Sequence, residues 1–376
     1  MSGAQAEMGE DPPRRIAVLR ALQLGDLLCA VPALRALRAA APQARITLIG
    51  LPWARGFVER YRAYLDDFMA LPGVPGLPEQ PVQIELMPAF VAAARQREFD
   101  LAIQLHGSGL RTNPLLMRLG AKRNAGFYMP GHACPDRSRF LPWSEREQEV
   151  LRALRLMELL GVTPQGNALE FPLHETDYRA LQDCDATLPT PGTYACLHPG
   201  ARMASRRWPP QRFAETADRL ARLGLRIVLT GSADEAGLTQ AVVHAMRAPA
   251  LDLAGKTSIG ALAALLSQAR LAICNDTGIS HVAVAVGTPS VVICSGADPQ
   301  RWAPLDRHRH RTLAHPVACR PCMHAACPIG HPCALGIEVD AVMREARDIL
   351  EGLDWPASGL EAMLPIAASA ERRLQP

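Results

Sequence analysis

Three short clusters of polar residues stand where an apolar run gives way to a helical pattern. Ligands of parallel α/β sheets bind at such strand ends. The first cluster is Gly25-Asp26, which follows the apolar run Arg15–Arg20. Its aspartate can cap the next helix, which is worth about 1 kcal/mol, or take a proton as a general base. The residues alone favour the cap. A helix start lowers the pKa of a carboxyl group and so weakens it as a base, whereas burial against a bound sugar would raise that pKa again.

The second cluster begins with His198-Pro-Gly200 and continues with Arg202, Arg206 and Arg207. Trp208-Pro-Pro210 follows, and proline suits a first helical turn. A glycine-containing loop with arginines that leads to a helix start suits an anion, because backbone N–H groups and guanidinium forks both bind phosphate. The alternative is an exposed basic loop without a ligand.

The third cluster runs from Asn275 to His281 and follows the apolar run Leu271–Cys274. Asp276 and Thr277 can cap the small-residue helix that comes next, and Gly278 lets a ligand approach the backbone. Free N–H groups at a helix start bind phosphate. Two such helix starts in one half of the chain predict a diphosphate ligand.

Four cysteines have the spacing C-x2-C-x4-C-x5-C, namely Cys319, Cys322, Cys327 and Cys333. This spacing is compatible with a structural Zn²⁺ or Fe–S site. The alternative is a compact loop of reduced thiols or occasional disulfides. Because the cysteines follow the third polar cluster along the chain, a structural role is favoured over a catalytic one.

Motifs of other nucleotide-dependent enzymes are incomplete. Gly255-Lys-Thr257 has the form of a P-loop end, but Ala250 stands where that motif needs glycine. The chain has no G-x-G-x-x-G, which argues against a nicotinamide enzyme. Asp183 and Asp185 have the spacing of a chelating pair, yet they lie in a proline-bounded stretch with no strand before them. We therefore expect no organic cofactor and no catalytic metal.

Apolar runs alternate with helical patterns along both halves of the chain, which indicates parallel βαβ units. We expect an α/β protein with two doubly wound, Rossmann-like parallel-sheet domains, residues 14–180 and 190–352. A cleft is expected between their facing strand ends, and a helical segment over residues 353–376. The expected strands are Arg15–Arg20, Arg45–Gly50, Phe99–Leu105, Tyr194–His198, Leu225–Thr230, Leu271–Cys274 and Ser290–Cys294, and a helix is expected over Glu145–Leu160.

Length and charge narrow the classes of function. A chain of 376 residues predicts about two domains. Its 40 Lys+Arg against 37 Asp+Glu leave a net charge of +3, too little for a nucleic-acid binder. No run reaches the roughly 18 apolar residues of a membrane span. Residues 1–13 are polar and lack the apolar core of a secretory signal, so we expect a cytoplasmic protein.

Taken together and in this order, the motifs resemble glycosyltransferase family 9, the bacterial lipopolysaccharide heptosyltransferases. The resemblance covers roughly residues 15–350, and the combination is specific although each piece is weak. The segments that carry it are Leu19–Pro32, Phe99–Gly107, His198–Gly200 with Trp208-Pro209, Asn275–His281, Gly287-Thr-Pro289 and the cysteine cluster.

The resemblance implies a GT-B fold that moves a heptose from ADP-heptose to a lipopolysaccharide core acceptor, with inversion and without a metal. It makes Asp26 the base, in an N-terminal acceptor-binding domain. It gives Arg206 a contact with donor phosphate, although family members often have lysine there, which alters the contact geometry. It implies that Asp276, Thr277 and Gly278 meet the donor in a C-terminal nucleotide-sugar-binding domain.

The same resemblance assigns further residues. Glu235 is the match for the acid that holds the ribose, and His281 belongs to the donor motif. On the acceptor side we expect Gly25, His106 and Arg111. The implied partners are a nucleotide-diphosphate sugar and a lipid-linked oligosaccharide, with weak peripheral contact at the inner face of the inner membrane and no nucleic acid. The surface expected for that contact is the segment 71–88 with Trp53, Phe57, Arg55, Arg60 and Arg62. The alternative is that Trp53 and Phe57 simply pack in the core.

Two other functions remain open from the sequence. A sugar-nucleotide epimerase or hydrolase on the same architecture would need no acceptor, so donor turnover without an acceptor would identify it. A non-catalytic scaffold would keep the two domains and transfer nothing. The presence of Asp26, Arg206 and Asp276 together argues against the scaffold.

Overall fold

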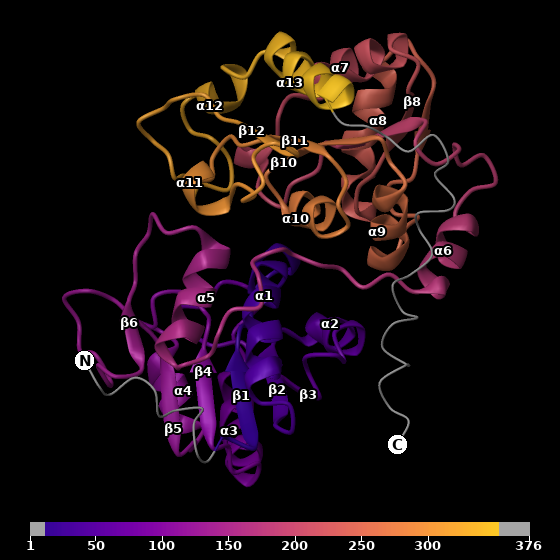
Figure 1. The fold of residues 1–376 in the computed structure, drawn as a ribbon. Coiled ribbons are helices and arrows are strands. Elements are labelled where there is room, and N and C mark those ends of the chain that lie inside the picture. The colour runs from indigo at the N-terminus through magenta and orange to yellow at the C-terminus, as the bar shows by residue number, and fades with distance from the viewer. Residues whose placement is uncertain (1–11, 353–376) are drawn as a thin grey trace. The chain divides into compact units, whose positions relative to one another are not determined.

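The structure, a computed structural model, describes residues 12–352, so the expected helical segment 353–376 lies outside the described residues. The chain divides into two compact units (Figure 1). Within the described residues, unit 1 comprises residues 12–172 together with Asp298–Ala303, and unit 2 comprises Leu173–Ala297 together with residues 304–352. Each unit has its own six-stranded parallel sheet with helices around it. The expected α/β class with two Rossmann-like sheets is confirmed.

The sheet of unit 1 has the order β3-β2-β1-β4-β5-β6, and all its neighbours are parallel. The order reverses between β1 and β4, and the loops that follow such a pair form the ligand-binding crevice of a doubly wound sheet. The strands are β1 (Arg15–Leu19), β2 (Arg45–Gly50), β3 (Asp67–Ala70), β4 (Leu101–Gln104), β5 (Arg123–Tyr128) and β6 (Phe140–Pro142). The helices are α1 (Leu24–Ala40), α2 (Arg55–Arg60), α3 (Met87–Gln96), α4 (Asn113–Arg118), α5 (Glu149–Leu159) and α11 (Pro299–Trp302), with 3-10 turns η1 (Pro52–Ala54) and η2 (Ile84–Leu86).

The centre of this sheet follows from its residue types. The strand β1 is a continuous apolar run whose last four residues are buried, as expected of a strand covered on both faces. The helix α1 begins at Leu24, where Gln23 and Asp26 cap its first turn reciprocally. It then packs against α5 (Figure 1). The loop after β1 is therefore held between a buried strand and a capped helix.

The sheet of unit 2 repeats the topology, with the order β12-β11-β10-β7-β8-β9 and its reversal between β7 and β10. The strands are β7 (Tyr194–His198), β8 (Arg226–Leu229), β9 (Ala250–Asp252), β10 (Leu271–Asn275), β11 (Ser290–Ile293) and β12 (His310–Leu313). The helices are α6 (Glu175–Gln182), α7 (Pro210–Arg222), α8 (Ala236–Ala245), α9 (Ile259–Ser267), α10 (Gly278–Ala285), α12 (Pro332–Leu335) and α13 (Val339–Gly352), with 3-10 turns η3 (Ala204–Arg206) and η4 (Ala233–Glu235).

The core of unit 2 is anchored by an aromatic pair at the start of α7. Trp208 and Phe213 are fully buried and meet edge to face, with ring centroids 5.2 Å apart. The indole Nε1 of Trp208 donates a hydrogen bond to the Ile337 carbonyl at 3.0 Å. The pair thereby joins α7 to the chain that leads into α13.

The structure adds elements that the sequence analysis did not predict. The strands β3, β6, β9 and β12 are only three or four residues long, and β5 starts with two polar residues. The helix expected from Glu145 starts at Glu149, because the side chain of Gln148 accepts hydrogen bonds from Val150 N and Leu151 N and so caps it there. The segment Asp298–Ala303, between β11 and β12 in the chain, packs with unit 1.

Within residues 12–352, no helix is both long and apolar enough to cross a bilayer.

We predict that Phe213→Ala lowers the free energy of unfolding of unit 2 by about 3–5 kcal/mol, because it leaves a cavity beside a fully buried tryptophan. Urea unfolding followed by tryptophan fluorescence measures the change. Leu223→Ala at the end of the same helix is the control, because Leu223 is 47% exposed. Its effect should stay within about 0.5 kcal/mol, and equal effects of the two variants would contradict the assigned core.

Candidate active site

The carboxylate of Asp26 lies at the start of α1, just beyond the carboxyl end of β1. Its Oδ2 accepts a hydrogen bond from the Gln23 N–H at 3.2 Å, which makes Asp26 part of a helix cap. Burial raises the pKa of Asp26, while Arg20 and Arg301 oppose the rise and Glu149 adds to it. Burial thus outweighs the helix start, which the sequence argument expected to lower this pKa. The group is a cap in this state and has a higher proton affinity than a free aspartate.

An ion pair that the sequence analysis missed lies behind Asp26. Arg20 and Glu149 are each about 3% exposed, and Arg20 Nη2 donates to Glu149 Oε1 at 3.1 Å. Arg20 Nε donates to the backbone oxygen of Asp26 at 2.8 Å. Burial raises the pKa of Glu149, but Arg20, Arg301 and Arg152 outweigh it and lower that pKa to about 2. Glu149 is therefore a permanent negative charge at neutral pH.

The residues expected on the acceptor side have different surroundings. His106 is buried, and its Nδ1 accepts a hydrogen bond from Ala21 N at 3.2 Å. Burial and the neighbouring Arg20 lower the pKa of His106 to about 4. Gly25 is buried within α1, whereas Arg111 is exposed. A neutral His106 thus holds the β1 loop, and Arg111 faces solvent.

In unit 2, Asn275 brings the second and third polar clusters together. It is fully buried at the end of β10. Its Oδ1 accepts from Trp208 N at 3.0 Å, and its Nδ2 donates to the Pro199 carbonyl at 2.8 Å. The loop after β7 is therefore fixed against the end of β10, two residues before Thr277, the N-cap of α10.

Unsatisfied donors lie at this junction. Arg206 Nη1 is 3.8 Å from Asp276 Oδ2. Within the described residues, the buried Arg206 Nε and Thr277 Oγ1 have no hydrogen-bond partner. Thr277 is the N-cap of α10, and the helix continues from Gly278. Buried donors without partners cost about 1–3 kcal/mol each, and at a helix start they suit an anion.

Glu235 lies at the other side of the β7 loop. Its Oε2 accepts from Ser232 N at 2.9 Å and is 3.9 Å from His198 Nε2. Burial lowers the pKa of His198, with Glu235 opposing. A Cβ atom at Gly200 would lie 2.3 Å from the Glu235 carboxylate, so a larger residue there would displace that carboxylate. His281, on α10, is buried.

Comparison with known proteins decides the family. The model of "Glycosyltransferase family 9 (heptosyltransferase)" matches residues 87–332, well over half of the chain. The chain belongs to glycosyltransferase family 9. The matched range contains the donor-side clusters of unit 2, whereas Asp26 precedes it.

Curated heptosyltransferases match parts of this family 9 chain. Lipopolysaccharide heptosyltransferase 1 of Pseudomonas aeruginosa is 27% identical over 255 residues, which are 62% of this chain and 65% of that protein. Lipooligosaccharide heptosyltransferase 2 of Haemophilus influenzae is 31% identical over 112 residues, 28% of this chain and 32% of that protein. The chain thus spans less than two thirds of the length of these relatives.

Solved structures show the GT-B fold. A family 9 glycosyltransferase from Veillonella parvula superposes with a TM-score of 0.73 at 22% identity, and the match covers 90% of this chain and 98% of that one. The expected fold is therefore confirmed for the two sheets, each with the strand order of a Rossmann-like domain.

The cysteine loop of this family 9 chain packs against the segment that carries Arg206. Ser205 Oγ donates to the His324 carbonyl at 2.5 Å, and Ser205 N donates to the Ala325 carbonyl at 3.1 Å. The imidazole Nε2 of His331 is 2.8 Å from the Ser205 carbonyl. The cysteines Cys319, Cys322, Cys327 and Cys333 form no disulfide. Among residues 12–352, no group of three or more His, Cys, Asp or Glu is arranged to hold a metal ion.

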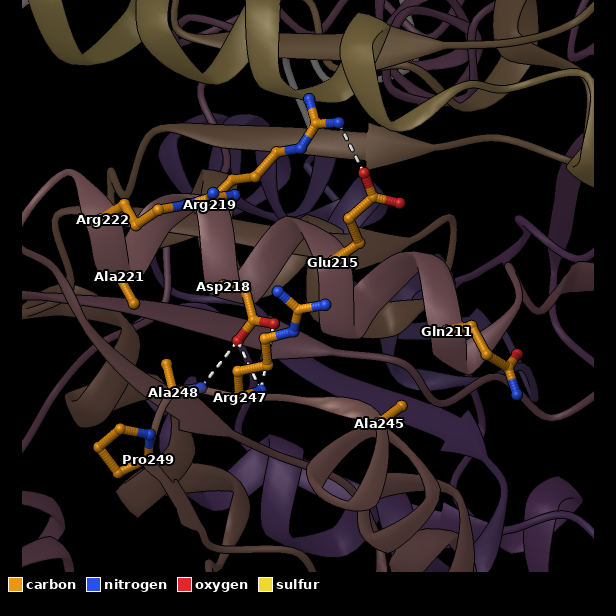
Figure 2. A pocket seen from close by; sticks show the side chains of 10 residues that line it. All are labelled: Gln211, Glu215, Asp218, Arg219, Ala221, Arg222, Ala245, Arg247, Ala248 and Pro249. Carbon is orange, nitrogen blue, oxygen red and sulfur yellow. Dashed lines mark hydrogen bonds and ion pairs between the residues drawn. The ribbon is translucent and has the colours of Figure 1, made fainter.

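A separate hollow lies on unit 2 beside α7. It measures about 900 Å³, and within it Asp218 accepts hydrogen bonds from Arg247 N and Ala248 N while Arg219 pairs with Glu215 (Figure 2). None of the residues predicted to bind the donor lines this hollow. The candidate site therefore rests on the strand-end clusters.

The surface expected to contact a membrane differs in detail from the prediction. Phe57 is 5% exposed and stacks on Tyr61, so it packs in the core, which was the alternative left open for it. Trp53 is 42% exposed. The arginines Arg55, Arg60 and Arg62 lie over Phe68, over Phe171 and against the Asp66 carbonyl, respectively. The apolar residues that are exposed in the segment 71–88 are Val82, Ile84 and Leu86.

We predict that, in His106→Gln, the free energy of unfolding of unit 1 falls less than in the wild type when the pH drops from 6.5 to 4. The pKa of His106 is about 4 in the folded chain against 6.5 for a free histidine. The unfolded chain therefore binds a proton first, and stability falls as the pH drops from 6.5 to 4. The lost free energy is on the order of 3 kcal/mol, and glutamine, which does not titrate, removes that part.

Urea unfolding at several pH values measures this difference. His132→Gln is the control, because His132 is exposed in the same unit. If His106→Gln and the wild type lost stability in parallel between pH 6.5 and 4, the buried neutral histidine would be refuted.

Proposed function

We propose that the chain is an inverting glycosyltransferase that moves a heptose from ADP-heptose to a lipopolysaccharide core acceptor. The observation that carries the proposal is the pair of buried donors, Arg206 Nε and Thr277 Oγ1, that lack partners at the start of α10. A diphosphate supplies the acceptor oxygens that such donors need. Family membership supports the reaction, and an E. coli heptosyltransferase of similar fold, with a TM-score of 0.60 at 20% identity over 89% of this chain and 99% of that one, is bound to ADP-2-deoxy-2-fluoro heptose.

The donor would bind to unit 2. Arg206 and the α10 start at Thr277 and Gly278 hold the diphosphate, and Glu235 accepts hydrogen bonds from the ribose hydroxyls. Asp276 keeps Arg206 in place, with 3.8 Å between their charged atoms. His281 lies one turn further along α10, where it is buried, and we assign it to the donor side.

The acceptor would bind to unit 1. Asp26 takes the proton from an acceptor hydroxyl, which attacks the anomeric carbon, and the bond from that carbon to the diphosphate oxygen breaks. The transition state carries positive charge on the sugar, as in glycoside hydrolysis. Arg206 and the helix start stabilise the diphosphate that leaves, because preorganised charge is the usual largest contribution to catalysis. This scheme needs no cofactor and no catalytic metal.

The raised pKa of Asp26 suits this role. A general base works best when its pKa is close to the working pH, and burial moves the pKa of Asp26 upward from that of a free aspartate. The Gln23 N–H that it accepts in the cap is replaceable by the acceptor hydroxyl. Gly25, His106 and Arg111 are proposed to line the acceptor side.

A lipid-linked acceptor implies work at a membrane surface. We place the protein in the cytoplasm, in weak peripheral contact with the inner membrane through Val82, Ile84, Leu86 and Trp53, the exposed apolar residues of unit 1 named above. The cations of the same surface are Arg55, Arg60 and Arg62. Near an anionic surface each contributes about 1 kcal/mol, so the attachment is weak and sensitive to salt.

We predict that Arg206→Ala weakens the binding of ADP by roughly 10- to 150-fold, because it removes a charge-assisted contact worth about 1.5–3 kcal/mol. Adenosine, which has no phosphate, should bind the variant and the wild type equally. Isothermal calorimetry measures both ligands. Arg202→Ala is the matched control, since Arg202 is an exposed arginine of the same loop, and an equal loss for ADP and adenosine would remove the phosphate role.

We predict that Asp26→Asn lowers the rate of transfer by about 10²–10⁴-fold, the usual contribution of a general base, and leaves ADP binding unchanged. Transfer from ADP-heptose to a heptose-deficient lipopolysaccharide core measures the rate, in buffer with EDTA. A variant with near-wild-type turnover would reduce Asp26 to a helix cap. Consumption of ADP-heptose without an acceptor, at the rate seen with one, would instead favour a hydrolase or epimerase.

A further inference from the structure

A line of charged side chains in unit 1 ends at Asp26. Arg301 Nε donates to Glu149 Oε2 at 3.0 Å. The other oxygen of Glu149 accepts from Arg20 at 3.1 Å, and Arg20 Nε holds the backbone oxygen of Asp26 at 2.8 Å. Three successive contacts therefore link Arg301 to the residue proposed as the base.

Arg301 reaches this position from an unusual place in the chain. It lies on α11, in the segment Asp298–Ala303 that stands between two strands of unit 2 in sequence but packs in unit 1. Asp298 caps α11 by accepting from Gln300 N at 2.9 Å. The guanidinium of Arg301 lies 4.6 Å from the ring centre of Trp302 and 5.3 Å from that of Trp143. Arg301 thus makes cation–π contacts with two tryptophans.

The charges of the cluster do not cancel without Asp26. Arg152 Nε is 3.8 Å from Glu147, which also pairs with Arg155. Glu149 contacts Arg20, Arg152 and Arg301, so one carboxylate serves three guanidinium groups. Arg301 also lies 3.8 Å from the exposed Glu145. The cluster therefore sets four arginines against three glutamates, Glu145, Glu147 and Glu149. One positive charge is left over near Asp26, and such a surplus favours an ionised carboxylate there.

A purely structural role is the competing explanation. Buried ion pairs add little net stability, since desolvation offsets the attraction. A pair that only ties α11 to α5 would affect folding without affecting the charge state of Asp26. The two explanations therefore differ in the titration of Asp26.

We propose that Arg301 is a positioning residue of the catalytic site, which acts through Glu149 and Arg20 to keep the Asp26 carboxylate ionised and ready to accept the acceptor proton. The proposal deepens the function stated above and rests on Asp26 as the base. Arg301 touches neither substrate in this scheme. It acts on the base alone.

The sign of the effect follows from the groups that face Asp26. These are Arg20 at the end of β1, Glu149 on α5 and Arg301 on α11, besides the Gln23 N–H of its own helix cap. Burial and Glu149 raise the pKa of Asp26, and Arg20 and Arg301 lower it. Loss of the Arg301 charge therefore raises this pKa further. Because the base acts in its ionised form, the acidic limb of the rate profile moves to higher pH.

The test uses the full-length chain with Arg301→Gln, Arg301→Lys and the control Arg307→Gln. Arg307 is an exposed arginine that follows the same segment, so its change alters net charge equally. Infrared titration of protein with ¹³C-labelled aspartate, with the Asp26→Asn spectrum subtracted, reports the protonation of Asp26 without any substrate. The pH dependence of kcat/KM for transfer from ADP-heptose to a heptose-deficient core is the second readout.

We expect Arg301→Gln to move both the Asp26 titration and the acidic limb to higher pH, with the high-pH rate retained. Arg301→Lys keeps the charge and should titrate close to the wild type, as should Arg307→Gln. An unshifted Asp26 titration in Arg301→Gln overturns the proposal, and so does a shift of equal size in Arg307→Gln. If Arg301→Gln does not fold, Arg301→Met takes its place. The proposal then requires that the Asp26 titration is shifted to higher pH in Arg301→Met and unshifted in Arg301→Lys, and an unshifted titration in Arg301→Met overturns it.

Failure of the proposed function gives a different result. If Asp26→Asn transfers heptose at the wild-type rate, Asp26 is not the base, whatever the titration shows. If Asp26→Asn is inactive and the Asp26 titration is the same in Arg301→Gln as in the wild type, Asp26 remains the proposed base. Only the role assigned to Arg301 is then refuted.

Discussion

Each sheet reverses its strand order at its centre, between β1 and β4 in unit 1 and between β7 and β10 in unit 2. Chains leaving the two central strands diverge there, and the backbone between them is left without a covering helix. The polar clusters of the sequence occupy these points. Gly25-Asp26 follows β1, the His198 loop follows β7, and Asn275 ends β10. Other contacts of the site hold these loops in place, such as the hydrogen bonds of Arg20 to the Asp26 backbone and of Asn275 to the loop after β7.

The parts of the fold that the sequence predicted are the strands buried on both faces. β1, β2, β4, β7, β8, β10 and β11 are apolar runs that need burial wherever they lie. The edge strands were missed for a physical reason. β12 reads His310–Leu313 and begins with polar residues, while β9 has three residues, so neither carries a periodic signal. Their pairing comes from the neighbouring strand and is a tertiary effect.

The candidate site divides in the same way. Motifs that are local in sequence were predicted as parts of the site. These are Asn275–His281 and the loop after β7, to which Asn275 is hydrogen-bonded. The Arg20–Glu149–Arg301 line was not predicted, because its contacts join residues 129 and 152 positions apart. No spacing rule connects them. The cysteine spacing did not indicate that backbone carbonyls of the same loop, those of His324 and Ala325, accept hydrogen bonds from Ser205 beside Arg206.

Asp26 combines two demands that oppose each other. A cap of α1 benefits from a low pKa, since the helix start favours the ionised form. A base benefits from a higher one. Burial supplies the rise, and the guanidinium groups of Arg20 and Arg301 limit it, so that the carboxylate remains both a cap and a proton acceptor. Glu149 makes this balance feasible. Without its negative charge, the buried Arg20 would have no ion-pair partner among those described for it, and the desolvation penalty of such a cation amounts to several kcal/mol. Arg301 would keep only the exposed Glu145, 3.8 Å away. The buried glutamate is therefore the group that lets two arginines stay close to the proposed base.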